Sequence, residues 1–139
     1  MALLDVNALV ALAWDAHIHH SAVRSWFATS APEGWATCPL TESGFVRVSS
    51  NPKVLPHPIS VEQARTVLRA LRENAHHRFL ADDVSLADTE IPPLPGHRQV
   101  TDAHLLAIAR RHDTRLVTFD AAAAKLARGD EVQLLTALG

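Results

Sequence analysis

Four acidic residues stand where predicted strands end or predicted helices begin. Asp5 interrupts the apolar run "ALLDV", and Asp120 directly follows "RLVTF". Glu42 and Asp102 lie in the first turns of predicted helices. In a parallel sheet, the carboxyl ends of the strands and the amino ends of the following helices share one edge. We therefore expect these four carboxylates to converge.

The chemistry that suits such a cluster is metal-dependent hydrolysis. Carboxylates crowded into a cleft repel one another and lose hydration, which makes sense if divalent cations fill the cleft. Because all the donors are oxygens, Mg²⁺ or Mn²⁺ is favoured over zinc. One cation polarises the attacking water and another stabilises the leaving oxygen of a phosphodiester. The predicted metal-holding catalytic set is Asp5, Glu42, Asp102 and Asp120.

Each acid taken alone also has a purely structural explanation. Asp102 or Glu42 in a first helical turn complements the helix dipole, which contributes about 0.3–1 kcal/mol. Asp5 is harder to explain in this way because it breaks an apolar strand, while Asn7 is a candidate cap for the next helix. Glu33, in the turn "APEG", is the nearby competitor of Glu42. The expected common edge is what favours a functional interpretation.

Strand-like and helix-like segments alternate along the chain. Apolar runs predict strands within residues 2–6, 35–38, 76–84, 115–120 and 131–135. Helical spacing predicts helices over residues 7–14, 20–30, 39–50, 60–74, 100–112 and 121–129. Ser60 with Gln63 forms a capping-box pattern, Thr101 is the expected cap of the fifth helix, and Gly129 is the expected end of the sixth. This alternation predicts an α/β fold with a parallel sheet covered on both faces.

Composition limits the class of protein. The chain has 139 residues, of which 47% are apolar, which predicts one domain over residues 1–139. A net charge of −2 excludes nucleic-acid binding by charge alone. The single Cys38 fits a reducing compartment. The apolar start carries Asp5 and lacks the basic segment of a signal peptide, and no run is long enough to span a bilayer. We expect a cytoplasmic protein with no membrane partner.

Several segments in this order resemble the PIN-domain family. They are "LLDVNALVAL", the acid Glu42, "TDAHLLAIAR" and "RLVTFD". Within that family the chain is most similar to VapC toxins of toxin-antitoxin pairs. The resemblance implies an α/β/α sandwich and a Mg²⁺- or Mn²⁺-dependent endoribonuclease. It also implies an RNA substrate, a VapB-type antitoxin and a homodimer.

The resemblance further implies roles for individual residues. The family's acidic residues correspond to Asp5, Glu42, Asp102 and Asp120. Thr118, in the family's "TFD" stretch, is expected to be a supporting polar residue near the metal, and we group Asn7 with it. The stretch from about residue 50 to 95 is variable across the family, so substrate choice is expected to reside there.

Basic residues outside the acidic segments are candidates for RNA contact. Arg65, Arg69 and Arg72 recur at helical spacing, apart from the acids in sequence, and could follow a phosphate backbone. The alternative is an ordinary solvated face. His97 and Arg98 precede the helix of Asp102 and are either RNA contacts or part of a connecting loop.

The remaining histidines and tryptophans have expected roles of their own. His17, His19, His20, His76 and His77 are expected to be solvated or to face RNA rather than to form a transition-metal site. The tryptophans are expected to be mostly core.

Three other functions remain open from the residues. One is a DNA-directed or structure-specific PIN nuclease using the same acids. Another is a response-regulator-like signalling module, which also gathers acids at a sheet edge but needs a pair of acids near the first strand and a late lysine. The third is a metal-free binding module, which the presence of four acids disfavours.

Overall fold

The computed structural model describes residues 1–88 and 91–136. In this part of the chain, five strands form one sheet in the order β3-β2-β1-β4-β5. The strands are β1 (Ala2–Leu4), β2 (Trp35–Thr37), β3 (His77–Phe79), β4 (Arg115–Thr118) and β5 (Val132–Leu134). Every neighbouring pair is parallel. The predicted parallel sheet is therefore confirmed, and each predicted strand is present.

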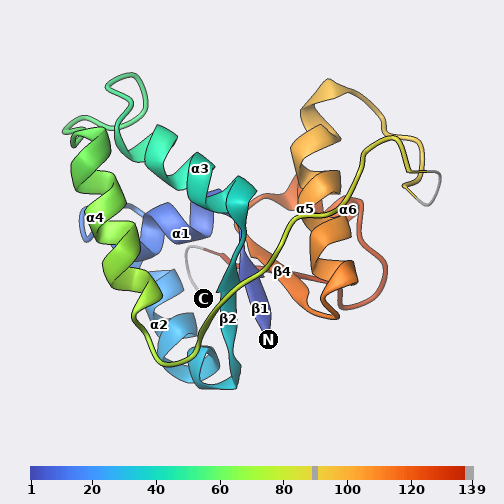
Figure 1. Ribbon diagram of the computed structural model, residues 1–139, viewed down its shortest axis with the longest axis horizontal. Coiled ribbons are helices and arrows are strands. Elements are labelled where there is room, and N and C mark those ends of the chain that lie inside the picture. The colour runs from blue at the N-terminus through green and yellow to red at the C-terminus, as the bar shows by residue number, and fades with distance from the viewer. Residues whose placement is uncertain (89–90, 137–139) are drawn as a thin grey trace.

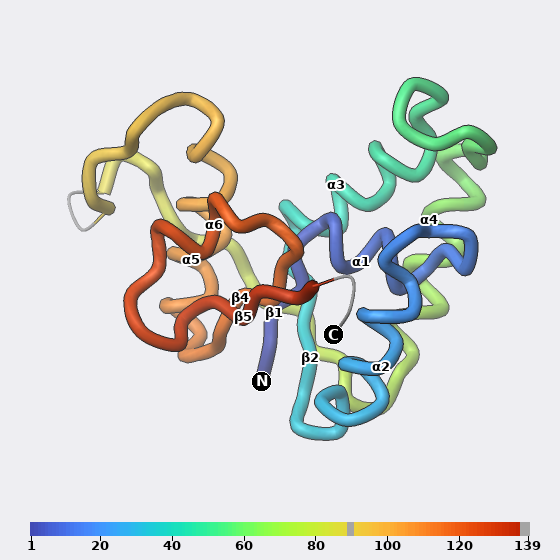
Figure 2. Tube along the Cα trace, turned by 180° about the vertical axis from the view of Figure 1, so that it is seen from behind, coloured from blue at the N-terminus to red at the C-terminus, as the bar shows by residue number. Residues whose placement is uncertain are grey.

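Helices cover both faces of the sheet. On one side lie α1 (Val6–Ala13), α2 (His20–Ser30), α3 (Pro39–Ser49) and α4 (Val61–Arg72), and on the other lie α5 (Val100–Arg111) and α6 (Ala121–Lys125), as Figures 1 and 2 show. Short 3₁₀ turns precede β2 and α5, at Ala31–Glu33 (η1) and His97–Gln99 (η2). None of the helices described here has the length and apolarity to cross a membrane. This arrangement confirms the α/β/α sandwich.

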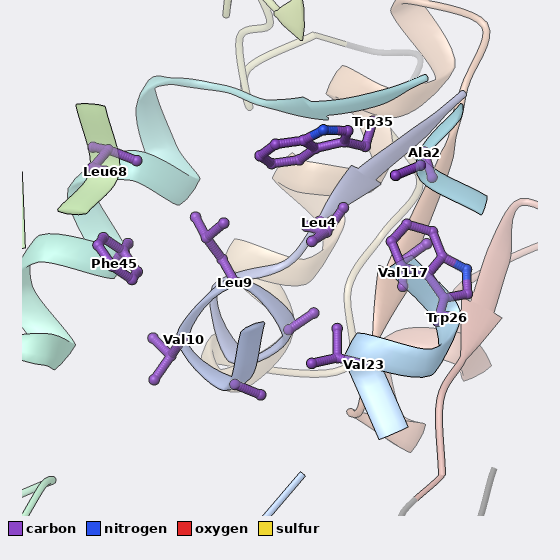
Figure 3. Packing of buried hydrophobic residues seen from close by; sticks show 13 residues of the cluster. Ala2, Leu4, Leu9, Val10, Val23, Trp26, Trp35, Phe45, Leu68 and Val117 are labelled. Carbon is purple, nitrogen blue, oxygen red and sulfur yellow. The ribbon is translucent and has the colours of Figure 1, made fainter. Parts of the chain in front are cut away.

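The side chains of each strand point alternately to the two faces of the sheet, so there are two hydrophobic cores, one on each face. Leu4 and Val117 point toward α1–α4 and pack with Trp35 (Figure 3), whereas Leu3 and Leu116 point toward α5. Successive side chains of a strand face opposite sides, so a sheet buried on both faces is apolar at every position. Of the tryptophans expected in the core, Trp26 and Trp35 are buried and Trp14 is half-buried.

The ends of the helices agree only in part with the prediction. Ser60 and Gln63 form the expected capping box of α4. Thr101 does not cap α5, because the turn of η2 runs directly into the helix and the Val100 N–H donates to the His97 carbonyl. Gly129 does not end α6, which stops at Lys125; with a φ of 57° it lies in the turn before β5.

Gly44 allows α1 and α3 to approach closely. A Cβ atom at this position would lie 2.5 Å from Cγ2 of Val6, a distance that side chains do not tolerate without movement. Each of these two residues is close in sequence to a predicted acid. Val6 follows Asp5, and Gly44 lies two residues after Glu42 in α3. The small residue therefore helps to set the relative position of these two acids.

We expect Gly44→Ala to destabilise the protein. Alanine normally favours a helix over glycine, but here the clash with Val6 costs about 1–3 kcal/mol and outweighs that gain. Urea unfolding of the variant measures the loss. Gly96→Ala is the matched control, since its Cβ would meet nothing closer than 3.5 Å. Equal stability of Gly44→Ala and the wild type would show that α1 and α3 are not packed this tightly.

Candidate active site

Three of the predicted acids interact electrostatically at the carboxyl edge of the sheet. Asp5 follows β1, Asp120 follows the neighbouring β4, and Asp102 lies in the first turn of α5. Burial raises the pKa of Asp102 from 3.8 to about 6, and the charges of Asp120 and Asp5 add to the rise. These three carboxylates therefore lie near enough to influence one another's ionisation, whereas Glu42, the fourth of the predicted set, has other partners.

Hydrogen bonds hold Asp5 in place. The Thr118 hydroxyl donates to Oδ2 of Asp5 at 2.7 Å, and the Val6 N–H donates to Oδ1 at 2.7 Å. The side chain of Asp5 thus caps α1, a role that the sequence had suggested for Asn7. Burial raises the pKa of Asp5 despite these two bonds, and the Asp120 charge raises it further. Asp5 is consequently a fixed carboxylate whose ionised form is costly.

Asn7 links α1 to the end of β4 instead of capping a helix. Its Nδ2 donates to the Thr118 hydroxyl at 3.2 Å, and its Oδ1 accepts from the Phe119 N–H at 3.2 Å. The Asp120 N–H also donates to the Thr118 hydroxyl, at 3.0 Å. The fully buried Thr118 hydroxyl is thus hydrogen-bonded to Asp5, Asn7 and Asp120. This geometry agrees with the supporting position expected for Asn7 and Thr118.

Glu42, in the first turn of α3, has different partners. Thr37 is the last residue of β2, and its hydroxyl donates to Oε2 of Glu42 at 2.6 Å. Nε of Arg72, from the end of α4, lies 3.6 Å from the same oxygen. The Glu42 side chain is only 15% exposed, which strengthens its interaction with the guanidinium. Glu33 precedes β2 in η1 and so stands at the opposite edge, which rules it out as the competing acid.

His77 adds a second hydrogen bond to the Thr37 hydroxyl. Its Nε2 lies 2.8 Å from the Thr37 hydroxyl. A hydroxyl carries a single hydrogen, and Thr37 donates it to Glu42, so Nε2 of His77 must be the donor. Burial lowers the pKa of His77 to about 4, with the Arg72 charge adding to the shift, so this imidazole is neutral at pH 7. Strand pairing places the half-buried His77 beside β2, so the expectation of a simply solvated His77 is wrong, and its contact with RNA stays a prediction.

Sequence reasoning missed Thr37 and His77. One signal was present: Thr37 ends its strand as Thr118 ends β4, and each hydroxyl donates to an acid.

Two other histidines that were expected to be solvated or to face RNA have contacts within the protein. His19 stacks on Phe119 with ring centroids 4.4 Å apart, and Nδ1 of His20 lies 2.8 Å from the Ala11 carbonyl oxygen.

One arginine of the α4 stripe reaches an acid of the predicted set. Arg65 pairs with Glu62 of its own helix at 3.0 Å, and Arg69 is exposed. Arg72 contacts Glu42, although the two residues are far apart in sequence. The last turn of α4 lies close to α3, and that packing was not apparent from the sequence.

The other two candidate RNA contacts lie before α5. His97 and Arg98 are exposed on η2, immediately before the helix that carries Asp102.

The donor chemistry of the site fits a hard cation. The converging groups are carboxylates, and the raised pKa values of Asp5 and Asp102 show that their ionised forms lack a compensating positive charge. Among the described residues, no three histidine, cysteine, aspartate or glutamate side chains are already gathered tightly enough to hold an ion. Asp5, Asp102 and Asp120 would therefore hold a cation directly only after their side chains move.

We expect Asp102→Asn to stabilise the protein in the presence of a chelator. The cost of ionising Asp102 is absent below pH 3.8, grows as the pH rises toward about 6 and is complete above it. Removing the charge at pH 7 should raise the free energy of unfolding by about 1 kcal/mol after allowance for solvent screening. Urea unfolding at pH 7 and pH 4 measures the gain, which should largely vanish at pH 4. The exposed Glu33→Gln is the control, and a loss of stability in Asp102→Asn at pH 7 would contradict the electrostatic coupling.

The sequence is similar to known proteins over nearly its whole length. Residues 2–129 match the PIN domain family. The chain is 64% identical over 141 residues to Ribonuclease VapC38 of Mycobacterium tuberculosis (strain ATCC 25618 / H37Rv), which covers 99% of this chain and 100% of that protein. It is 45% identical over 137 residues to Ribonuclease VapC39 of the same strain, which covers 96% of this chain and 99% of that protein.

Solved structures share the fold at low identity. Mycobacterium tuberculosis VapC20, described as a sarcin-ricin loop cleaving toxin, superimposes with a TM-score of 0.64 at 13% identity, covering 96% of this chain and 99% of that one. VapBC2 from Rickettsia felis, bound to a DNA fragment from its promoter, gives 0.63 at 13% identity, covering 97% of this chain and 98% of that one. The family expected from the sequence is confirmed: the chain belongs to the PIN-domain family and, within it, to the VapC ribonucleases.

Proposed function

We propose that this protein is the toxin of a VapBC pair and cleaves RNA at the carboxyl edge of its sheet. The observation that carries the proposal is the placement of Asp5, Asp102 and Asp120 at the carboxyl edge of the sheet, where burial and their charges raise the pKa of Asp5 and Asp102. It occurs in a chain that is 64% identical to a protein named as a ribonuclease. Family membership also removes the support for a response-regulator-like module or a metal-free binding module.

Asp5, Glu42, Asp102 and Asp120 are the residues that would hold Mg²⁺ or Mn²⁺, directly or through water. When bound, such a cation supplies Lewis-acid activation of water and stabilises charge on the phosphate oxygens. Oxygen donors favour these ions over zinc.

The protein's own contribution is to fix the positions of the acids. Thr118 restrains Oδ2 of Asp5, and Thr37 restrains Oε2 of Glu42. The neutral His77 orients Thr37 because it donates to the hydroxyl and leaves the Thr37 hydrogen for Glu42. Arg72 supplies a positive charge beside Glu42, where an incoming phosphodiester needs one.

Partners follow from the same assignment. We propose a VapB-type antitoxin as the protein partner, supported by the shared fold with the toxin of a VapBC assembly. A homodimer, a cytoplasmic location and one PIN domain over residues 1–139 complete the proposal. Gel filtration with light scattering, alone and with a co-expressed antitoxin, tests both assembly states.

We expect cleavage of RNA to require a divalent cation. Purified protein is incubated with total cellular RNA in Mg²⁺, in Mn²⁺ or in excess chelator, and new 5′ ends are mapped. Defined ends should appear with either cation and disappear with chelator, since the carboxylates alone repel the phosphate. Single-stranded DNA of the cleaved sequence, tested in parallel, examines the DNA-directed alternative.

Variants connect this activity to the acids. Asp5→Asn should reduce cleavage by about 10²-fold or more while the fold persists, as circular dichroism would show. Glu33→Gln, at the opposite edge, should cleave as the wild type does. Undiminished cleavage in excess chelator, or by Asp5→Asn, would overturn the metal-carboxylate site.

We expect the exposed part of the α4 stripe to follow the RNA backbone. Arg65→Gln with Arg69→Gln leaves the Arg72 contact to Glu42 intact and removes two phosphate contacts. Each lost contact should lower the slope of log affinity against log salt by about 0.7 for a single strand. RNA affinity is measured at several salt concentrations in chelator, so that no cleavage occurs.

The matched control for the stripe is Arg115→Gln. Arg115 begins β4 and therefore lies at the edge opposite the acids. Its substitution should leave the salt slope unchanged. If the double variant also keeps the wild-type slope, the stripe is an ordinary solvated face and the RNA path runs elsewhere, with His97 and Arg98 the next residues to test.

A further inference from the structure

We propose that Phe79, supported by Arg72, forms a stacking subsite for a nucleobase of single-stranded RNA beside the cleavage site. The inference rests on the proposed ribonuclease function and adds a contact to the base rather than to the phosphate. It is carried by the position of Phe79, by its exposure and by the guanidinium that covers its ring.

Strand pairing places Phe79 at the catalytic edge. It is the last residue of β3 and pairs in register with Thr37, the last residue of β2. Register partners in parallel strands direct their side chains to the same face of the sheet. Thr37 donates to Glu42 on that face, so Phe79 lies one strand away from the donor that holds this acid.

Phe79 is exposed at the end of an edge strand. It is 45% exposed, and Leu134, which ends the other edge strand, is 41% exposed, whereas Thr37 and Thr118, which end inner strands, are fully buried. It belongs to neither buried core cluster in the described part of the chain. Exposed aromatic rings beside cationic side chains are the platforms on which proteins stack unpaired bases. Phe79 therefore offers an exposed aromatic surface, beside a guanidinium, at the edge that carries the acids.

Arg72 connects this ring to the acids. Its guanidinium carbon lies 4.7 Å from the centroid of the Phe79 ring, and its Nε lies 3.6 Å from Glu42. The guanidinium lies over the ring, and the 45% exposure of Phe79 leaves ring surface on which a base can stack. The same positive charge can meet the phosphate attached to that nucleotide. Ring and guanidinium together suit one nucleotide, with its base on Phe79 and its phosphate near Arg72.

The test compares two RNA probes that differ only in their bases. One is a fluorescent twelve-residue oligoadenylate, and the other is a fluorescent twelve-residue ribose-phosphate oligomer without bases. Both are titrated with protein in excess chelator, which prevents cleavage. Phe79→Ala should weaken binding of the oligoadenylate about tenfold and leave binding of the abasic oligomer unchanged, because stacking on an aromatic side chain is the interaction removed.

Three further variants make the result specific. Phe79→Tyr should restore oligoadenylate affinity, whereas Phe79→Leu, which keeps an apolar side chain, should not. Leu86→Ala removes another exposed apolar side chain, 43% exposed, and should have no effect. Circular dichroism confirms that each variant is folded.

The outcomes separate this proposal from the ribonuclease proposal. Unchanged oligoadenylate affinity in Phe79→Ala overturns the stacking subsite. So does an equal loss on both probes, since that means the ring acts only by holding Arg72 for phosphate. Either result leaves the ribonuclease proposal intact if the wild type still cleaves cellular RNA with Mg²⁺. Failure of that cleavage contradicts the proposed function itself.

Discussion

The parallel pairing of all the strands is the constraint on which the site depends. It places every strand's carboxyl end at one edge, so residues as distant in sequence as Asp5 and Asp120 become neighbours. β1 lies at the centre, and the Asp5 N–H donates to the Val117 carbonyl at 2.9 Å, which continues the ladder one residue beyond the strand. The backbone of Asp5 is therefore as fixed as the sheet itself. An antiparallel pairing of the same segments would scatter the acids over two edges.

Opposing forces act on the buried carboxylate of Asp5. Burial and the Asp120 charge disfavour ionisation, whereas hydrogen bonds from Thr118 and Val6 favour it, and burial prevails because the pKa rises. The bonds fix the orientation of the carboxylate without fully compensating its charge. The buried charge of Asp5 thus destabilises the fold at this edge, and the two apolar cores on either side of the sheet stabilise it. A cation would supply the missing compensation, which links the electrostatics of the fold to the proposed chemistry.

Local sequence patterns predicted the helices and strands, and they predicted that Asp5, Asp102 and Asp120 lie at the carboxyl edge of the sheet, because hydrophobic period and strand-end position are local properties. Contacts made by packing were not predictable in this way. Arg72 and Glu42 are 30 residues apart in sequence and meet only because α4 returns along α3. His77 and Thr37 meet only because β3 pairs with β2. The assignment of the α1 cap to Asn7 failed for a related reason: the partner that Asn7 adopts, Thr118, is more than a hundred residues away.

The distribution of charge at the carboxyl edge of the sheet bears on RNA binding more than the net charge of the chain does. A net charge of −2 suggests weak attraction to RNA, and the three coupled aspartates make the immediate site repulsive to phosphate. Arg72, the last residue of α4, contacts both Glu42 and Phe79. The arginines of α4 attract phosphate, whereas the three aspartates repel it. A polyanion can be drawn to the arginines first and brought to the acids only when a cation neutralises them. The dependence on cations that we propose would follow from this distribution of charges.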